Sequence, residues 1–203
     1  MRNQEMKISG AGSNLSVAAG PVWRTVKFRL LGVIPLLLFI SRLIEYVSVG
    51  TPSHIQWCCH ISNLLLAVGM ILANPWMIRI AAFWLILGVP PWIIDMINIR
   101  IITPVSVFSH LGGFLIALFA IRKVGAKRWS WVPALIYFLM LQQISRFTTP
   151  ASLNVNVGHN AYGPWKDLFS SYWKYWLVST ALTAALLWMI EVALLKLFKS
   201  AED

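Results

Sequence analysis

The chain has 203 residues, of which 58% are hydrophobic and only 12% are charged. A soluble domain of this length cannot bury so much apolar surface, so the composition excludes an ordinary soluble enzyme. The formal net charge is +10, but the basic residues lie at the ends of apolar runs and in one short loop. This placement is typical of the cytoplasmic flanks of a membrane protein and argues against a nucleic-acid partner.

In chain order, the first residues are polar, and we expect a cytoplasmic tail over 1–25. One transmembrane domain follows over 26–198, and a short second cytoplasmic tail over 199–203. Apolar runs of about 20 residues predict transmembrane helices, and Pro, Gly and Asn separate several of them. The domain contains these runs: 28–48, 56–73, 77–97, 104–122, 130–148 and 171–197. The expected fold class is all-α, a six-transmembrane-helix bundle.

The distribution of Lys and Arg predicts how this bundle is oriented. Arg24 and Lys27 precede the first run, the loop 122–128 reads RKVGAKR, and Lys196 closes the last run. The loop 49–55 contains neither Lys nor Arg. With six spans, the basic segments all fall on one side, which is the cytoplasmic side by the positive-inside rule. Both termini are therefore expected in the cytoplasm.

Polar side chains of the runs, and of the last outer loop at 154–165, gather on the opposite, outer side. An ionised side chain at the centre of a membrane costs about 2.5–3.5 kcal/mol on insertion scales. A shared polar pocket in the outer half of the bilayer accounts for these groups. They are Arg42, Glu45, His60, Ser62, Asn63, Asp95, Ser109, His110, Arg146, His159 and Asn160.

Within this set, Ser62 and His110 predict a catalytic nucleophile–base pair. His60 and Ser62 point about 200° apart on a helix, because each residue turns about 100°. The base for Ser62 must therefore come from another helix, and His110 has a suitable depth on the fourth span. His60 and Asn63 share one helix face and are expected to orient a substrate or bind an oxyanion.

The other polar residues of the outer half are predicted to bind substrate: Arg42, Glu45, Asp95, Arg146, His159 and Asn160. We expect no cofactor and no resident metal. Cys58 and Cys59 are adjacent and form no CxxC motif. A metal site built from His60, His110 and His159 is an alternative, although no HxxxH pair supports it.

Short segments between about residues 54 and 190 resemble the YwaF-like bacterial integral membrane proteins. They are HISN at 60–63, FWLILGVPPWIID at 83–95, FSHLGGFLIAL at 108–118 and HNAYGPW at 159–165. The same broad superfamily includes a eukaryotic transmembrane phospholipid acyltransferase and, more distantly, androgen-induced-protein-like lipid hydrolases. The resemblance implies a histidine on the fourth span, carried by His110, and a nucleophile on the second. Ser62 stands at the cysteine position of the acyltransferase, and Cys58 and Cys59 lie one turn earlier.

Two hypotheses of function follow. The first is an enzyme of lipid metabolism, an acyltransferase or ester hydrolase acting on membrane lipids in the inner (plasma) membrane of a bacterium. The second is a non-enzymatic binding or transport protein for a polar headgroup or small solute. In that case Arg42, Asp95 and Arg146 would set the charge preference. The lack of an evident two-fold internal repeat weighs against a typical secondary transporter.

Overall fold

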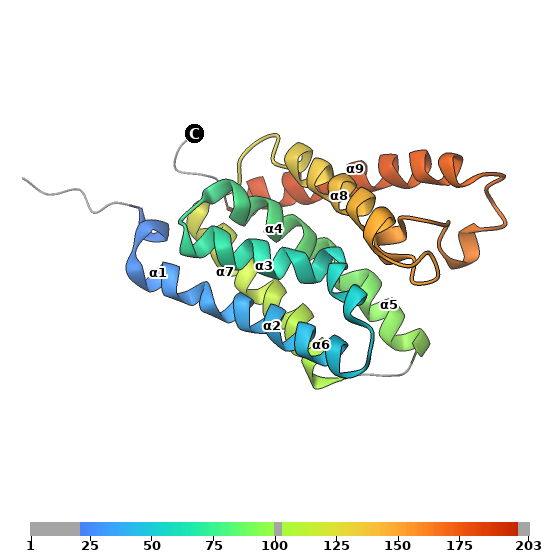
Figure 1. The fold of residues 1–203 in the computed structure, drawn as a ribbon. Coiled ribbons are helices and arrows are strands. Elements are labelled where there is room, and N and C mark those ends of the chain that lie inside the picture. Colours follow the sequence, from blue (N-terminus) through green and yellow to red (C-terminus); the bar gives the residue numbers. More distant parts are fainter. Residues whose placement is uncertain (1–20, 100–102, 199–203) are drawn as a thin grey trace, which may run out of the picture.

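The computed structural model describes residues 21–99 and 103–198 (Figure 1). Within these ranges the regular structure is helical and contains no strand, which confirms the all-α prediction. Residues 1–20 of the expected amino-terminal tail, and all of the expected tail at 199–203, lie outside the described residues. The end of the first tail is structured, because Val22–Arg24 form the short helix η1 and Trp23 is buried.

Short helices continue into one another because the residues at their joints keep helical backbone angles, as Gly32 does between α1 and α2. The elements after η1 are α1 (Val26–Leu31), α2 (Val33–Ser48), η2 (Pro52–Gln56), α3 (Cys58–Ile71), α4 (Pro75–Leu87), α5 (Val89–Ile99), α6 (Pro104–Val107), η3 (Phe108–Gly112), α7 (Gly113–Val124), α8 (Trp131–Thr148), η4 (Val155–Val157), η5 (Gly163–Trp165) and α9 (Tyr172–Leu197).

Among the described residues, four continuous helical stretches are long and apolar enough to cross a membrane. They are Val26–Ser48, Pro75–Asn98, Pro104–Val124 and Tyr172–Leu197. The other two expected spans coincide with α3 and α8, which do not meet the same standard of length and hydropathy. α3 has only 14 residues, and the last turns of α8 carry Gln142, Gln143 and Arg146. The fold is thus that of a helical membrane protein.

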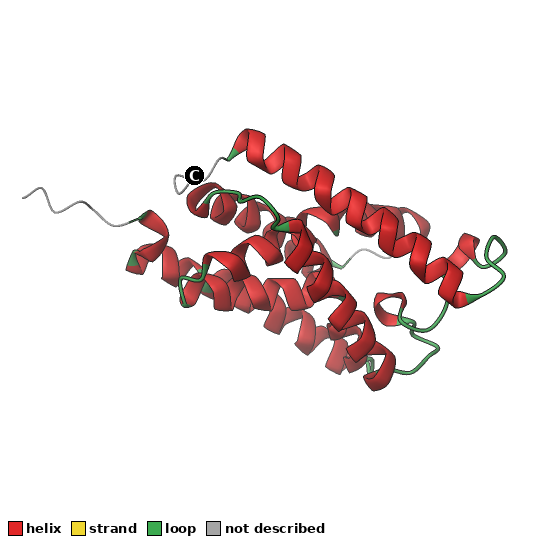
Figure 2. Cartoon of the chain, turned by 90° about the horizontal axis from the view of Figure 1, so that it is seen from above, coloured by secondary structure: helices red, strands yellow, loops and turns green. Residues whose placement is uncertain are grey.

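α4 lies in the middle of the bundle, in contact with α3, α7, α8 and α9 (Figure 1). Its buried face includes Ala81 and Ala82, whose small side chains let neighbouring helices approach closely. Gly69 of α3 acts in the same way, because a Cβ there would lie 2.9 Å from the Cβ of Met77. Figure 2 shows the long helices running in roughly one direction, with loops at both ends of the bundle.

One end of the bundle holds the loop between α7 and α8 and the end of α9. The backbone N–H of Ala126 donates to the carbonyl of Phe198 at 2.6 Å. Arg79 of α4 is 1% exposed, and its guanidinium donates to the carbonyls of Gly125 at 2.9 Å and Val124 at 3.3 Å. These bonds hold the loop against the body of the bundle.

The carboxylate of Glu191 joins α9 to the start of α8. Its two oxygens accept hydrogen bonds from the backbone N–H groups of Trp129 at 3.1 Å and Trp131 at 3.0 Å. The side chain of Ser130, at the N-cap of α8, makes no capping bond. Glu191 therefore supplies the cap from another helix, and its charge also suits the positive end of the helix dipole.

We predict that Glu191→Ala destabilises the folded protein by about 1–3 kcal/mol, because two partly buried N–H groups lose their acceptors. Glu191→Gln keeps one acceptor oxygen and should lose less than half as much. Denaturant unfolding of both variants in the same detergent measures the difference. Equal losses in the two variants would contradict a capping role.

Candidate functional site

Buried polar side chains gather near the start of α3, at the end of the bundle opposite Phe198. His60, Ser62 and Asn63 are each at most 2% exposed. The side chain of Trp57, at the N-cap of α3, makes no capping bond. Instead, the N–H of Cys58 donates to Oδ1 of Asn156 at 2.8 Å.

Asn156 belongs to η4 and anchors the loop before α9 onto the bundle. Its side-chain amide donates to the carbonyl of Gln56 at 2.8 Å and to Oγ of Ser145 on α8 at 2.9 Å. Its φ of +52° lies in the left-handed region, where asparagine is better tolerated than most residues. The start of α3 is thus held against α8 by one buried side chain.

His110 lies on η3, a π-helical turn between α6 and α7. Such turns insert one extra residue into a helix and occur frequently at functional sites. Nδ1 of His110 lies 2.9 Å from the carbonyl oxygen of Ser106 and 3.3 Å from Oγ of Ser109. Its ring stacks on Trp92 of α5, with 4.8 Å between centroids. Because a carbonyl can only accept, Nδ1 carries the hydrogen and Nε2 keeps its lone pair.

His110 meets Cys59 and His60 of α3, and these three residues are called the Cys–His cluster below. One donor atom of each residue lies within 4.8 Å of the other two. The rings of His60 and His110 are in edge contact, with centroids 5.4 Å apart. Sγ of Cys59 lies 3.8 Å from Nδ1 of His60. A thiol and two imidazoles therefore converge from two separate helical segments.

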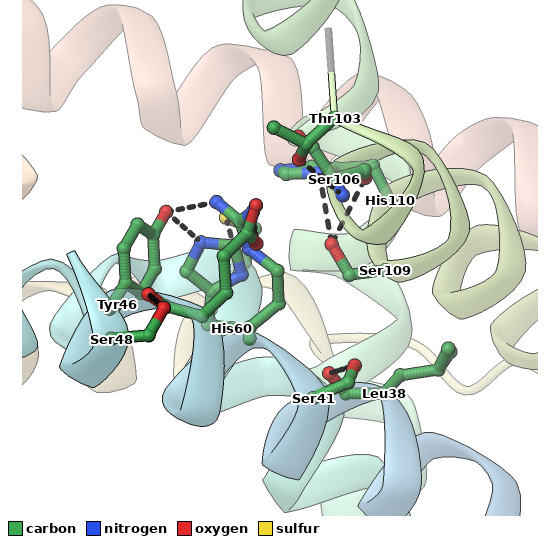
Figure 3. A network of polar contacts seen from close by, with 12 residues as sticks. Leu38, Ser41, Tyr46, Ser48, His60, Thr103, Ser106, Ser109 and His110 are labelled. Carbon is green, nitrogen blue, oxygen red and sulfur yellow. Dashed lines mark hydrogen bonds and ion pairs between the residues drawn. The ribbon is translucent and has the colours of Figure 1, made fainter.

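A hydrogen-bonded chain from α2 orients His60. The hydroxyl of Tyr46 lies 3.0 Å from Nε2 of His60, and Figure 3 shows this contact opposite the Ser106–His110 segment. The guanidinium of Arg42 donates to the same hydroxyl and to the carboxylate of Glu45. Arg42 and Glu45 thus form an ion pair one step removed from the cluster.

The structure does not bring Ser62 and His110 together. The hydroxyl of Ser62 contacts Sγ of Cys58 at 3.8 Å and the hydroxyl of Tyr137 on α8 at 3.5 Å. Among the described residues, no hydrogen bond joins Ser62 to His110. The reason is the rotation of α3. At about 100° per residue, His60 lies about 100° from Cys59, whereas Ser62 lies about 60° away in the opposite direction.

Asn63 lies on the face of α3 that carries Cys59. Its amide donates to the carbonyls of Cys59 at 3.2 Å and Ser109 at 3.1 Å, so it ties α3 to η3. Its Oδ1 is buried and has no hydrogen-bond partner among the described residues. A Cβ on Gly113 would lie 2.4 Å from that oxygen. Asn63 therefore positions the Cys–His cluster and requires glycine on the facing helix.

Asp95 and Arg146 contact the loop between α8 and α9 instead of the cluster. Asp95 accepts a hydrogen bond from the hydroxyl of Tyr162 at 2.9 Å. This bond to a carboxylate raises the pKa of Tyr162, since the ionised phenol would lose it and repel Asp95. Arg146 donates to the carbonyl of Gly158 at 3.2 Å and lies over the ring of Tyr172.

His159 and Asn160 also belong to this loop. Their backbone N–H groups both donate to Oδ1 of Asn154 at 3.0 Å. Among the described residues, the close group of metal-ligand atoms comes from Cys59, His60 and His110. His159, the third ligand of the alternative metal site, is not part of this group.

Cys59 and Tyr46 are not among the site residues predicted from the sequence. Their spacing could have indicated them. Cys59 precedes Asn63 by four residues and Tyr46 follows Arg42 by four, so each lies on the same helix face as a predicted site residue.

Comparisons with protein-family models, with curated proteins and with solved structures find no match for this chain. Its function must therefore be inferred from the geometry of its side chains.

We predict that Gly113→Ala destabilises the protein by about 1–2 kcal/mol. Overpacking against Asn63 costs about 1–3 kcal/mol, and the better helix propensity of alanine offsets up to about 1 kcal/mol. Gly112→Ala is the matched control, because its Cβ would meet only the flexible end of Leu38, at 3.3 Å. Thermal unfolding should show a lower midpoint for Gly113→Ala alone. Equal shifts in both variants would mean that the Asn63 contact is unimportant.

Proposed function

We propose that this protein spans the membrane six times, with both termini in the cytoplasm. α3 and α8 then cross together with the four long apolar stretches. α3 alone is about 21 Å long, and η2 and the anchored η4 loop extend the crossing at its start. The basic loop 122–128 and Lys196 lie on the cytoplasmic side. The Cys–His cluster then lies in the outer half of the bilayer.

Labelling of engineered cysteines with a membrane-impermeant maleimide tests this orientation. Ser48→Cys and Ser170→Cys, both at exposed positions, should react in intact cells. Arg128→Cys should react only after the membrane is permeabilised. The parent chain, with its native Cys58 and Cys59, sets the background. Labelling of Arg128→Cys from outside would overturn the proposed orientation.

The function that the cluster supports best is acyl transfer or hydrolysis of a membrane-lipid ester, with Cys59 as the nucleophile. The observation that carries this proposal is the convergence of the Cys59 thiol with His60 and His110, donor atoms within 4.8 Å of one another. A thiol needs a base to take its proton and an oriented donor to stabilise the thiolate. The two histidines can supply the base and the donor. Contacts of this kind are commonly somewhat longer in a ligand-free site than in the reacting complex.

The hydrogen-bond directions assign a role to each histidine. Nδ1–H of His110 donates to the carbonyl of Ser106, which leaves Nε2 to accept the proton of Cys59. Arg42 donates to the oxygen of Tyr46, so the hydroxyl hydrogen of Tyr46 is free to bond Nε2 of His60. His60 then carries its hydrogen on Nδ1, the nitrogen 3.8 Å from Sγ of Cys59, and donates it to the thiolate.

The reaction proceeds in two balanced steps. The thiolate of Cys59 attacks the ester carbonyl of a lipid, a thioester forms, and the alcohol leaves with the proton held by His110. Water or a second lipid alcohol then attacks the thioester while His110 again takes and returns a proton. The resemblance in sequence adds support, since it implies a nucleophile on the second span and His110 on the fourth. The nucleophile proposed here is one turn earlier than Ser62.

We predict that purified protein in phospholipid vesicles releases or exchanges acyl chains. Turnover should fall by about 10²–10⁴-fold in Cys59→Ala and His110→Ala, because each removes a reacting group. Cys58→Ala and Ser62→Ala should stay within a few-fold of the wild type. The acyl group of the thioester intermediate on Cys59 should be released by neutral hydroxylamine. This reagent cleaves a thioester and spares an oxygen ester.

Loss of turnover in Ser62→Ala, with Cys59→Ala active, would return the role of nucleophile to Ser62. A wild type without turnover would overturn the enzymatic proposal and favour a binding protein.

A further inference from the structure

We propose that the Cys–His cluster binds a zinc ion, with Cys59, His60 and His110 as ligands. The inference rests on the proposed function in one respect. A bound zinc ion occupies the thiol that acts as nucleophile, so zinc is a reversible inhibitor of acyl transfer. The binding site itself follows from the geometry of the three side chains and does not depend on that activity.

The distances suit a metal after a small contraction. The donor atoms lie within 4.8 Å of one another. Zinc binds nitrogen at about 2.0–2.1 Å and thiolate sulfur at about 2.3 Å, so ligand atoms in a tetrahedral site stand about 3.3–3.6 Å apart. Rotation of the three side chains by a fraction of an ångström to about 1 Å each closes this gap.

The donor set selects the metal by its chemistry. One thiolate and two imidazoles are ligands of zinc and of similar transition metals, whereas magnesium and calcium require oxygen ligands. Three protein ligands also leave a fourth position for water or a substrate oxygen. The nearby charges do not oppose a cation strongly, because the guanidinium of Arg42 is paired with Glu45.

Both histidines already have the outer contacts that orient metal ligands. A histidine that binds a metal normally donates the N–H of its second ring nitrogen to a carbonyl, carboxylate or similar group. Nδ1 of His110 lies 2.9 Å from the carbonyl of Ser106, which directs Nε2 into the cluster. Nε2 of His60 lies 3.0 Å from the hydroxyl of Tyr46, which directs Nδ1 toward Cys59.

Zinc binding releases one proton from the site and changes the tautomer of His60. Binding requires the thiolate of Cys59, so one proton is released for each zinc ion bound. His60 must offer a lone pair on Nδ1, so its hydrogen moves to Nε2. The oxygen of Tyr46 accepts that hydrogen as readily as its hydroxyl donates in the metal-free state. Cys59 and His60 lie in the first turn of α3, next to η2, which the proposed topology places at the outer side of the membrane.

The test is metal binding by the purified full-length chain, read without any activity assay. After equilibration in a zinc buffer, elemental analysis should find one zinc ion for each chain. Cobalt(II) in place of zinc should give a thiolate-to-metal charge-transfer band. Zinc should also raise the unfolding temperature of the wild type, a readout that requires no variant.

Variants identify the ligands. Cys59→Ser should abolish the charge-transfer band, and His60→Asn and His110→Asn should weaken zinc binding by at least about 100-fold. Tyr46→Phe should weaken it by about 10-fold through the orientation of His60. Cys58→Ser is the matched control, because Cys58 is the sequence neighbour of Cys59 and lies outside the cluster, and this variant should bind zinc as the wild type does. Absence of zinc from the wild type, or an equal loss in Cys58→Ser, would overturn the site.

A zinc titration of turnover separates this inference from the proposed function. Inhibition of the wild type at one zinc ion per chain supports both. Turnover that depends on Cys59 but is insensitive to zinc, in a chain that binds none, overturns the zinc site alone. Zinc binding through Cys59 in a chain without turnover supports the site and overturns the enzymatic proposal.

Discussion

Polar groups buried between apolar helices must find their hydrogen-bond partners within the protein, and this requirement determines how the start of α3 is packed. α3 buries His60, Ser62 and Asn63 almost completely. Each therefore needs a partner on a neighbouring segment. Tyr46 of α2, Tyr137 of α8 and the carbonyl of Ser109 on η3 supply these partners. The same contacts place the neighbouring helices around α3.

The Cys–His cluster is a consequence of that packing. Asn63 ties α3 to η3 through two carbonyls, and the close approach requires Gly113 on the facing helix. Once α3 and η3 are joined in this way, Cys59 and His60 meet His110. The outer contacts of both imidazoles then decide which ring nitrogens face the thiol. Rigid supports of this kind keep reacting groups in a productive geometry.

The proposed thiol chemistry and the proposed zinc binding would both use one arrangement of side chains. Both need the sulfur of a thiolate and the lone pairs of imidazoles to converge at one point. As a nucleophile, Cys59 requires one imidazole as a base and one as a donor. As metal ligands, the same three residues require only a different tautomer of His60. The hydroxyl of Tyr46 permits both tautomers, because it can either donate a hydrogen bond to Nε2 of His60 or accept one from it. A membrane enzyme with such a site would respond to the metal content of its surroundings.

The sequence by itself determined the helical class, the positions of the apolar segments and the end of the bundle at which polar groups gather. These follow from hydropathy and from the composition of each segment, which are local properties. Only the tertiary structure decided that Cys59, and not Ser62, faces His110. That choice depends on the rotation of α3 against its neighbours and on the π-helical turn at Phe108–Gly112. Both arise from packing between segments distant in sequence, which no local pattern encodes.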